Sequence, residues 1–304
     1  MPTHDLVIQE NYGLFNFNNP IMPPERFDIA DDLFIGKIDS RTAKIVLDFG
    51  DPKGYKIDAP HRQGGYFYAF VRIVREPASM HRWDTDQRLQ TAIALSRLVK
   101  PTSISFRNAG RVRYNNDGTV KHAYPAWLRG VDPDPWLPED STKYRDWLIE
   151  SEMDEVKALF ESMAACTLPV RVSRAFFYNE YAARTYYGEV RWVLVCTALE
   201  SLLNTDPYHS GAQFRERVPL VASNANIPFT EDEARKAWSM RSHLSHGGAT
   251  GRLTPPEEEV YKKLEIVLRG VLKKAILDSD FASTFADDSR IRANWPVFIS
   301  GKSI

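Results

Sequence analysis

The sequence predicts an α+β protein in which a β-rich N-terminal half is followed by an all-α helical bundle. Short runs of β-branched and aromatic residues dominate the first half, whereas apolar stripes at helical spacing dominate the second. The densest proline cluster, Asp132–Pro138, separates the two halves. We therefore expect four segments: an irregular N-terminal arm over residues 1–30, an α+β domain over 31–135, a helical bundle over 139–278, and a C-terminal tail packed on the bundle over 279–304.

The first half begins with an arm that is rich in asparagine and proline, which disfavours regular structure. Beyond it, β-branched and aromatic runs bounded by turn residues predict strands at Leu33–Lys37, Lys44–Phe49 and Tyr66–Val74. Apolar residues at helical spacing predict one helix over Asp84–Val99, which ends before Pro101. This domain is thus predicted to combine several strands with a single helix.

A β-hairpin is predicted near the end of the same domain. Asn115–Gly118 is strong turn chemistry, and it lies between the strand-like runs Arg111–Tyr114 and Thr119–Tyr124. Ser103–Phe106 alternates like a further strand. Since no cluster of acids, bases or nucleophiles occurs here, we expect this domain to carry no chemistry and to sense or recruit a partner.

Basic residues without any acidic ones occupy the stretch between Gln87 and Asn116. They are Arg88, Arg97, Lys100, Arg107, Arg111 and Arg113. Such a run is usually a solvated face, but it is also the best candidate in this half for attracting a polyanion. Within it, the predicted RNA-binding residues are Arg107, Arg111 and Arg113.

The second half is predicted to be helices with short connections. Apolar stripes predict helices over Ser141–Thr167, Ser173–Tyr187 and Glu189–Leu203, with a shorter one over Phe214–Ala222 that Pro219 must begin, kink or end. The helix over Glu189–Leu203 has a wide apolar stripe and is predicted to be central. Thr230–Glu233 and Thr254–Glu257 are capping boxes, and each marks the start of another helix.

Composition places the chain among ordinary globular proteins. It has 304 residues and a formal net charge of −1, so no global charge points to a polyanion as partner. Its cysteines, Cys166 and Cys196, both occur in apolar helical patterns and are expected to be buried thiols in a reducing compartment. The sequence contains neither a basic segment followed by an apolar run at its start nor an apolar run long enough to span a membrane. We therefore expect a cytoplasmic protein without a membrane partner.

A compact polar motif closes the helix that starts at Thr230. It reads Met240-Arg241-Ser242-His243-Leu244-Ser245-His246-Gly247-Gly248. Arginine offers a rigid fork of donors that matches phosphate oxygens, and neutral histidine accepts a proton from a hydroxyl near neutral pH. The motif is therefore predicted to handle phosphate without a metal or other cofactor. Alternatively, the arginine is a solvated helix residue and the histidines favour the negative end of the helix dipole.

The pair of histidines and Glu200 each have two possible interpretations. His243 and His246, spaced three apart, share one face of a helix as zinc ligands do, but no third ligand stands nearby in the sequence. Glu200, beside the apolar stripe of the central helix, is predicted either to orient a catalytic arginine or histidine or to form a rim carboxylate or internal salt bridge. The other polar side chains predicted to support the site are those of Ser242, His243 and Ser245.

The spacing from Arg241 to His246 resembles the Arg, four to six residues, His signature of the HEPN superfamily. Upstream, Ala198-Leu199-Glu200-Ser201-Leu202 looks like the Ala-Leu-Glu-x-Leu core of its Apea-like branch, and the ending Arg-Ser-x-x-x-His-Gly-Gly resembles that branch as well. Ser242 stands where active members more often have Asn or Asp. The resemblance covers about the second half of the chain.

The resemblance implies a HEPN-type helical bundle that acts as a metal-independent endoribonuclease, in a toxin or antiphage defence role. His246 would then serve as acid or base at a ribose 2′-hydroxyl, Arg241 would stabilise the phosphate, and RNA and a regulatory protein would be partners. Residues five apart are separated by about 140° on a helix, so Arg241 and His246 need something to bring them together. Gly247 and Gly248 could do so by letting the last turn depart from helical geometry, and a two-fold homodimer could do so by combining an arginine and a histidine from each chain. The resemblance implies the homodimer. The alternative is an inactive HEPN module that dimerises and binds RNA or protein.

Overall fold

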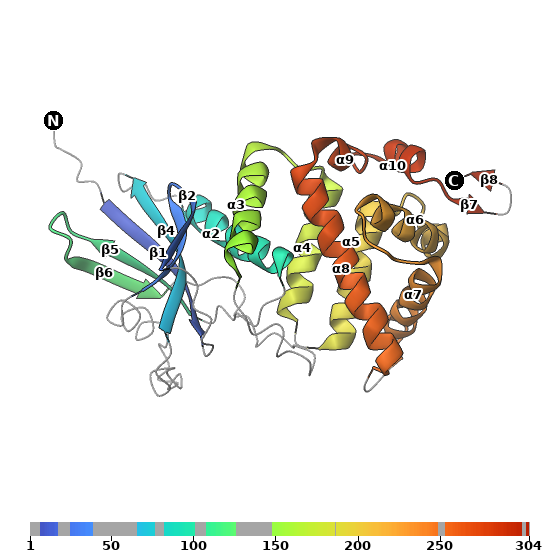
Figure 1. Ribbon diagram of the computed structural model, residues 1–304, viewed down its shortest axis with the longest axis horizontal. Helices are drawn as coiled ribbons and strands as arrows, with labels where there is room; N and C mark the ends of the chain where they lie inside the picture. Colours follow the sequence, from blue (N-terminus) through green and yellow to red (C-terminus); the bar gives the residue numbers. More distant parts are fainter. Residues whose placement is uncertain are drawn as a thin grey trace. The chain divides into compact units, whose positions relative to one another are not determined.

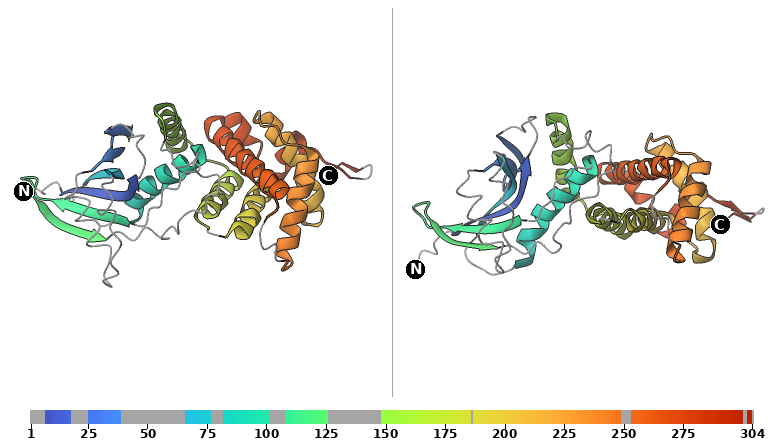
Figure 2. Two further views of the ribbon diagram at one scale, coloured as in Figure 1. Left: turned by 60° about the horizontal axis from the view of Figure 1, so that its bottom comes forward. Right: turned by 90° about the horizontal axis from the view of Figure 1, so that it is seen from below.

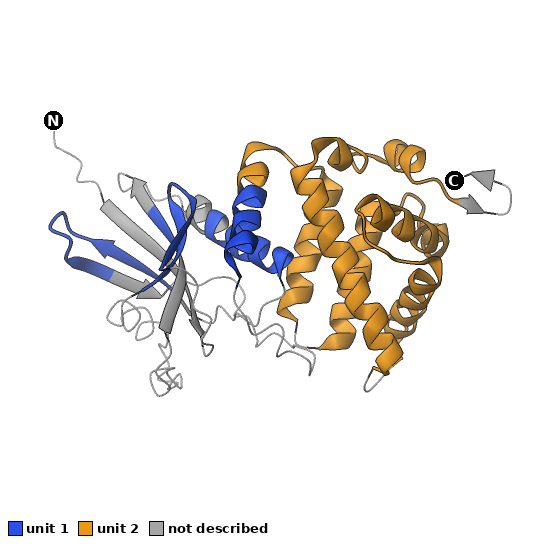
Figure 3. Ribbon diagram, viewed as in Figure 1, with its two compact units in different colours: residues 1–160 blue, residues 161–304 orange. Residues whose placement is uncertain are grey.

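The computed structural model confirms the predicted α+β class, with strands in the first half of the chain and helices in the second (Figure 1). It describes residues 7–17, 25–38, 66–76, 82–100, 108–125, 148–185, 187–248, 253–299 and 302–303. The chain divides into two compact units, residues 1–160 and residues 161–304 (Figure 3). The proline cluster at which we expected the boundary lies outside the described residues.

The first unit is built on a six-stranded antiparallel sheet. Its strands are β1 Val7–Phe17, β2 Arg26–Ala30, β3 Leu33–Lys37, β4 Tyr66–Glu76, β5 Asn108–Tyr114 and β6 Val120–Pro125. They lie in the order β2-β3-β4-β1-β5-β6, and every neighbouring pair is antiparallel. The strands predicted at Leu33–Lys37 and Tyr66–Val74 and the predicted hairpin are confirmed, whereas Lys44–Phe49 and Ser103–Phe106 lie outside the described residues.

The irregular arm predicted over residues 1–30 is wrong. Strand β1 occupies the middle of the sheet and pairs with β4 from Val7 opposite Glu76 to Phe17 opposite Tyr66, while β5 pairs along its other edge. Strand β2 forms one edge of the sheet. The partners of β1 come from far along the chain, so its backbone hydrogen bonds do not depend on the local asparagine-rich composition.

One helix packs on this sheet. Helix α2, Arg82–Val99, contacts β4 and β1 (Figure 2), as expected from its apolar spacing. The unit also contains most of α3, Glu150–Ala165, so this helix belongs largely with the sheet. The buried core of the unit includes Ile29, Leu33, Ile35, Val71, Leu89, Ile93, Leu95, Leu98, Val112, Met153 and Val156.

The second unit is helical, with a short terminal hairpin. Its elements are α4 Val170–Arg184, α5 Gly188–Leu203, the 3-10 turn η3 Pro207–His209, α6 Ser210–Asn224, α7 Glu231–Ser245, α8 Pro255–Leu277, α9 Ser279–Ser283, α10 Asp288–Asn294, β7 Phe298–Ile299 and β8 Lys302–Ser303. Helix α5 packs against α4, α6, α7 and α8 and is central to the unit, as predicted. None of the helices in the described residues is both long and apolar enough to cross a membrane.

Both predicted capping boxes are confirmed. The backbone N–H of Thr230 donates to Glu233 at 2.7 Å and that of Thr254 to Glu257 at 2.7 Å, which satisfies donors that a helix start otherwise leaves free. Helix α6 is longer than predicted and carries Pro219 in its interior, so this proline neither begins nor ends it.

The C-terminal segment packs through aromatic rings. Phe281 and Phe285 lie edge to face with centroids 5.2 Å apart, and Phe285 stacks on Trp295 at 6.2 Å. All three side chains are buried, so the tail has an aromatic cluster of its own. The expectation for the cysteines is half correct: Cys196 is buried in α5, but Cys166 is exposed because it follows the last residue of α3.

Candidate active site

Arg241 lies in the third turn of α7 and turns toward α5. Its guanidinium donates to the Glu200 carboxylate at 3.1 Å, and its Cζ lies 5.0 Å from the centroid of the Trp238 ring. The carboxylate fixes one edge of the guanidinium, and the indole covers one face through a cation–π contact. This contact is an internal salt bridge, and it is also the arrangement in which Glu200 would orient Arg241, so both interpretations of Glu200 remain open.

The Arg241–Glu200 pair is partly removed from solvent. The Glu200 side chain is 12% exposed and that of Arg241 27%. Each has one buried polar atom, Oε1 of Glu200 and Nε of Arg241, with no hydrogen-bond partner among the described residues. Burial raises the pKa of Glu200, and the nearby guanidinium offsets part of that rise. The Glu200 carboxylate is thus costly to bury, and it holds the Arg241 cation in place.

Two further contacts join α5 to α7. The Trp192 indole N–H donates to the carbonyl of Ala237 at 3.1 Å, and the Cys196 thiol approaches the same oxygen at 3.9 Å. Burial is the main cause that raises the pKa of Cys196, so the thiol stays neutral. These side chains set the distance between the two helices and so the placement of Arg241 against Glu200.

His246 is the C-cap of α7, and its imidazole is exposed. Its backbone N–H donates to the carbonyls of Ser242 and His243 at 3.1 and 3.3 Å. The chain then leaves the helix through Gly247, whose φ of +84° favours glycine, and a β-carbon on Gly248 would collide with the His243 ring. The two glycines thereby end the helix and leave the His246 imidazole in solvent.

The structure does not bring Arg241 and His246 into contact within one chain. Arg241 faces α5, whereas His243, Ser245 and His246 are exposed and Ser242 is half-buried. This divergence agrees with the angle of about 140° between residues five apart on a helix. For the zinc alternative, no third ligand joins the two histidines within the described part of the chain.

Helices α6 and α7 follow one another in the chain and pack against each other. The end near their connection lies against α8, where Lys274 donates to the Asn224 carbonyl at 2.7 Å and Lys263 pairs with Glu233 at 2.8 Å. At the other end, a β-carbon on Gly211, in the first turn of α6, would lie 2.7 Å from the Trp238 indole nitrogen. The start of α6 therefore lies beside the half of α7 that carries Arg241.

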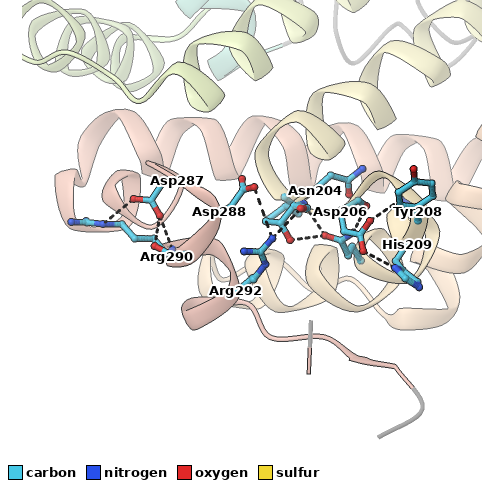
Figure 4. Close-up of polar contacts among 12 residues, drawn as sticks. Asn204, Asp206, Tyr208, His209, Asp287, Asp288, Arg290 and Arg292 are labelled. Atoms are coloured by element: carbon cyan, nitrogen blue, oxygen red, sulfur yellow. Dashed lines mark hydrogen bonds and ion pairs between the residues drawn. The ribbon is translucent and has the colours of Figure 1, made fainter. Parts of the chain in front are cut away.

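An Asp–His pair immediately precedes α6. Asp206 accepts a hydrogen bond from the Tyr208 N–H at 2.8 Å, and its other oxygen lies 2.7 Å from Nδ1 of His209 (Figure 4). The hydrogen bond to His209 is the largest cause that lowers the pKa of Asp206. The sequence analysis did not single out these residues, and the signal it passed over is an Asp three residues before a His at a helix start.

Three arginines hold the segment that leads from α5 to this pair. Arg171 donates to the carbonyls of Ser201 and Asn204, and Arg292 donates to that of Thr205 at 3.1 Å. Fully buried Arg217 donates to the carbonyl of Leu203 at 2.5 Å, and burial lowers its pKa to about 10. Cations near the end of a helix compensate its free carbonyls, so the chain that carries Asp206 is well ordered.

The basic run of the first unit is largely engaged in internal contacts. Arg88 pairs with Asp32 at 2.9 Å, and Lys100 pairs with Glu152 at 3.4 Å. Arg111 and Arg113 point to the same face of β5 and are half-buried, whereas Arg107 lies outside the described residues. The run is therefore not simply a solvated face.

Comparison of the chain with protein-family models, with curated proteins and with solved structures gave no match.

Proposed function

We propose that the protein is a metal-independent endoribonuclease of HEPN type, in which Arg241 stabilises a phosphate and His246 transfers a proton. The observation that carries the proposal is the placement of Arg241, which Glu200 and Trp238 hold in a partly buried position on the helix that ends in the exposed His246 imidazole. An ordered guanidinium needs little rearrangement to meet the charge that develops on a phosphate. The HEPN resemblance stated above supports the same assignment.

In this reaction RNA supplies its own nucleophile. A ribose 2′-hydroxyl loses its proton, attacks the adjacent phosphorus, and expels the 5′-oxygen of the next nucleotide, which leaves a 2′,3′-cyclic phosphate. His246 takes up or delivers one of the protons, and Arg241 neutralises the additional negative charge on the phosphate oxygens. Ser242, His243 and Ser245 are supporting residues at the edge of this site and transfer no proton in the reaction.

A second copy of the chain is part of the proposal. Arg241 and His246 diverge within one chain, and a two-fold axis near the end of α7 would place an arginine and a histidine from each copy around one phosphate. A toxin or antiphage defence role, a cytoplasmic location and a regulatory partner protein also belong to the proposal, on the strength of the resemblance.

The second candidate is a catalytically inactive HEPN module that dimerises and binds RNA or protein. One observation favours it: Glu200 already occupies one edge of the Arg241 guanidinium, so this arginine also has a purely structural explanation. In this alternative the two residues join α5 to α7, and His246 only ends the helix.

A single assay distinguishes the two candidate functions. Purified protein is incubated with total RNA in EDTA, alongside the Arg241→Ala, His246→Ala and His243→Ala variants. We expect cleavage by the wild type and by His243→Ala, products that end in 2′,3′-cyclic phosphate, and a loss of roughly 10²- to 10⁴-fold for His246→Ala. RNA that is bound but not cleaved by any of the proteins would favour the inactive module.

A further inference from the structure

We propose that His209, held by Asp206, is the general acid that protonates the leaving 5′-oxygen, so that one chain supplies two imidazoles to the reaction. This inference rests on the proposed ribonuclease function and extends it to a residue of a different helix. The juxtaposition that carries it lies at Trp238 of α7: the first turn of α6, which His209 precedes, contacts this ring, and Arg241 lies over the same ring.

Cleavage by a 2′-hydroxyl requires two proton transfers. The 2′-oxygen gives its proton to a base as the new bond to phosphorus forms, and the bond from phosphorus to the 5′-oxygen breaks as an acid protonates that oxygen. One proton enters and one leaves, so the reaction needs no co-reactant. Within one chain His246 can serve only one of these transfers, so the other belongs either to the second copy's His246 or to another group of the same chain.

The start of α6, which His209 precedes, contacts the helix that carries Arg241. Helices α6 and α7 each contain 15 residues and are joined by residues 225–230, and that connection lies against α8. The first turn of α6 contacts Trp238 through Gly211, and Arg241 lies over the same Trp238 ring.

A second path through the chain leads to the same place. Glu200, which pairs with Arg241, lies in the last turn of α5, and the chain runs from there to Asp206 in six residues. The contacts of Arg217 with the carbonyls of Leu203 and Trp295 hold this path in place. Both partners of the Asp206–His209 pair are thus anchored to the elements that position Arg241.

The orientation of the His209 ring suits proton transfer. Nδ1 faces Asp206 Oδ2 at 2.7 Å, and Nε2 has no hydrogen-bond partner among the described residues, while the side chain is 44% exposed. A carboxylate at Nδ1 fixes the tautomer and the plane of the imidazole ring, so that Nε2 is the nitrogen that faces away from Asp206. Nε2 is therefore the atom that delivers the proton.

The charged surroundings are those of an accessible site. Asp206 faces the imidazole, and Arg292 approaches Asp206 from α10, where it also lies 4.0 Å from Asp288. Tyr208, the residue before the histidine, is 92% exposed, so nothing in the described chain covers this side of the pair. Arg292 supplies a positive charge that favours the approach of a phosphate.

The test uses a dinucleotide whose leaving 5′-oxygen is replaced by sulfur, because a thiolate departs without a proton. With the ordinary dinucleotide, His209→Ala is expected to lose roughly 10²- to 10⁴-fold in cleavage rate. With the sulfur analogue, the same variant is expected to cleave at nearly the wild-type rate. Asp206→Asn should lose less than His209→Ala on the ordinary substrate and should likewise recover on the analogue.

The controls separate this inference from a structural role and from the proposed function. His122→Ala removes an exposed histidine on β6 and should change neither rate, and His209→Gln keeps a polar side chain at the start of α6 in case the alanine variant unfolds. The inference is overturned if His209→Ala and His209→Gln cleave the ordinary dinucleotide at the wild-type rate, or if their cleavage rates fall by the same factor on both substrates. Either result leaves the proposed function standing. A wild-type protein that cleaves neither substrate overturns the proposed function itself.

Discussion

At the scale of single residues, the Arg241–Glu200 pair links stability to the candidate chemistry. A guanidinium that is to meet a phosphate must be ordered before the substrate arrives, and the Glu200 carboxylate provides that order at 3.1 Å. The carboxylate itself is 12% exposed and therefore depends on the arginine for compensation of its charge. Removing either partner alone thus has consequences for folding as well as for activity.

Arg241→Ala is expected to destabilise the protein by about 1–3 kcal/mol, because it leaves a buried carboxylate without its partner. The structure thereby sets it apart from His246→Ala, which alters an exposed side chain and should change stability by no more than about 0.5 kcal/mol. Urea denaturation of the wild type, Arg241→Ala and His246→Ala at neutral pH measures the difference in the free energy of unfolding.

The control for this prediction is the double variant Arg241→Met with Glu200→Gln, which removes both charges and keeps side chains of similar size. It should be more stable than Arg241→Ala, since no uncompensated charge remains in the site. Equal stability of Arg241→Ala and the wild type would show that the ion pair contributes nothing to folding.

The pH dependence of stability provides a second prediction at this scale. Burial raises the pKa of folded Glu200 above its usual value of 4.5, so above pH 4.5 the folded protein keeps a proton that the unfolded chain has lost. The stability that this proton confers is complete below pH 4.5 and is lost as pH rises through the folded pKa.

Glu200→Gln has no such proton, so it is the matched reference. We expect the free energy of unfolding of the wild type, measured relative to Glu200→Gln, to fall as pH rises from 4 and then to level off. Urea denaturation across pH 4–8 measures this difference. A difference that instead grows with pH would mean that attraction to Arg241 outweighs burial.

At the scale of elements, the sequence predicts a helix or strand correctly where the pattern depends on residues close together in the chain. The capping boxes at Thr230 and Thr254 and the apolar stripe of α5 predict helices because each depends on residues within one or two turns. Strand β1 could not be predicted, because its partners β4 and β5 are distant in the chain. The candidate site divides in the same way: Arg241 and His246 belong to one helix, but the position of His209 depends on how α6 folds back against α7.

The end of α7 gives a prediction about a turn. Gly247 has a φ of +84°, so Gly247→Ala is expected to destabilise the protein by roughly 1–2 kcal/mol and to displace the His246 imidazole, with a loss of RNA cleavage. Asparagine tolerates this backbone region, and Gly247→Asn should retain most stability and activity. Thermal unfolding and RNA cleavage of the two variants measure the effect, and similar behaviour of alanine and asparagine here would show that the turn does not position His246.

At the scale of the whole molecule, the two units contribute unequally to the proposed function. The paired Arg241 and Glu200, the exposed His246 and the Asp206–His209 pair all belong to residues 161–304. In the first unit, the described basic residues Arg88 and Lys100 are engaged in ion pairs, so only part of the run is available to a polyanion. With a net charge of −1, the chain has no overall excess of cations with which to hold RNA, and a second copy would double those at the end of α7.

The last prediction is that the full chain is a dimer through the helix that ends at His246. Light scattering at micromolar concentration should return about twice the chain mass of 34.8 kDa. Exchange of the exposed Ser245 for arginine would place like charges across a two-fold axis at this end of α7, and it should shift the protein toward monomer and reduce RNA cleavage together. Ser151→Arg, the same exchange at an exposed position of α3, is the control and should alter neither property. A wild-type monomer that still cleaves RNA would show that one chain completes the site, and His209 would then be the group that replaces the second copy's histidine.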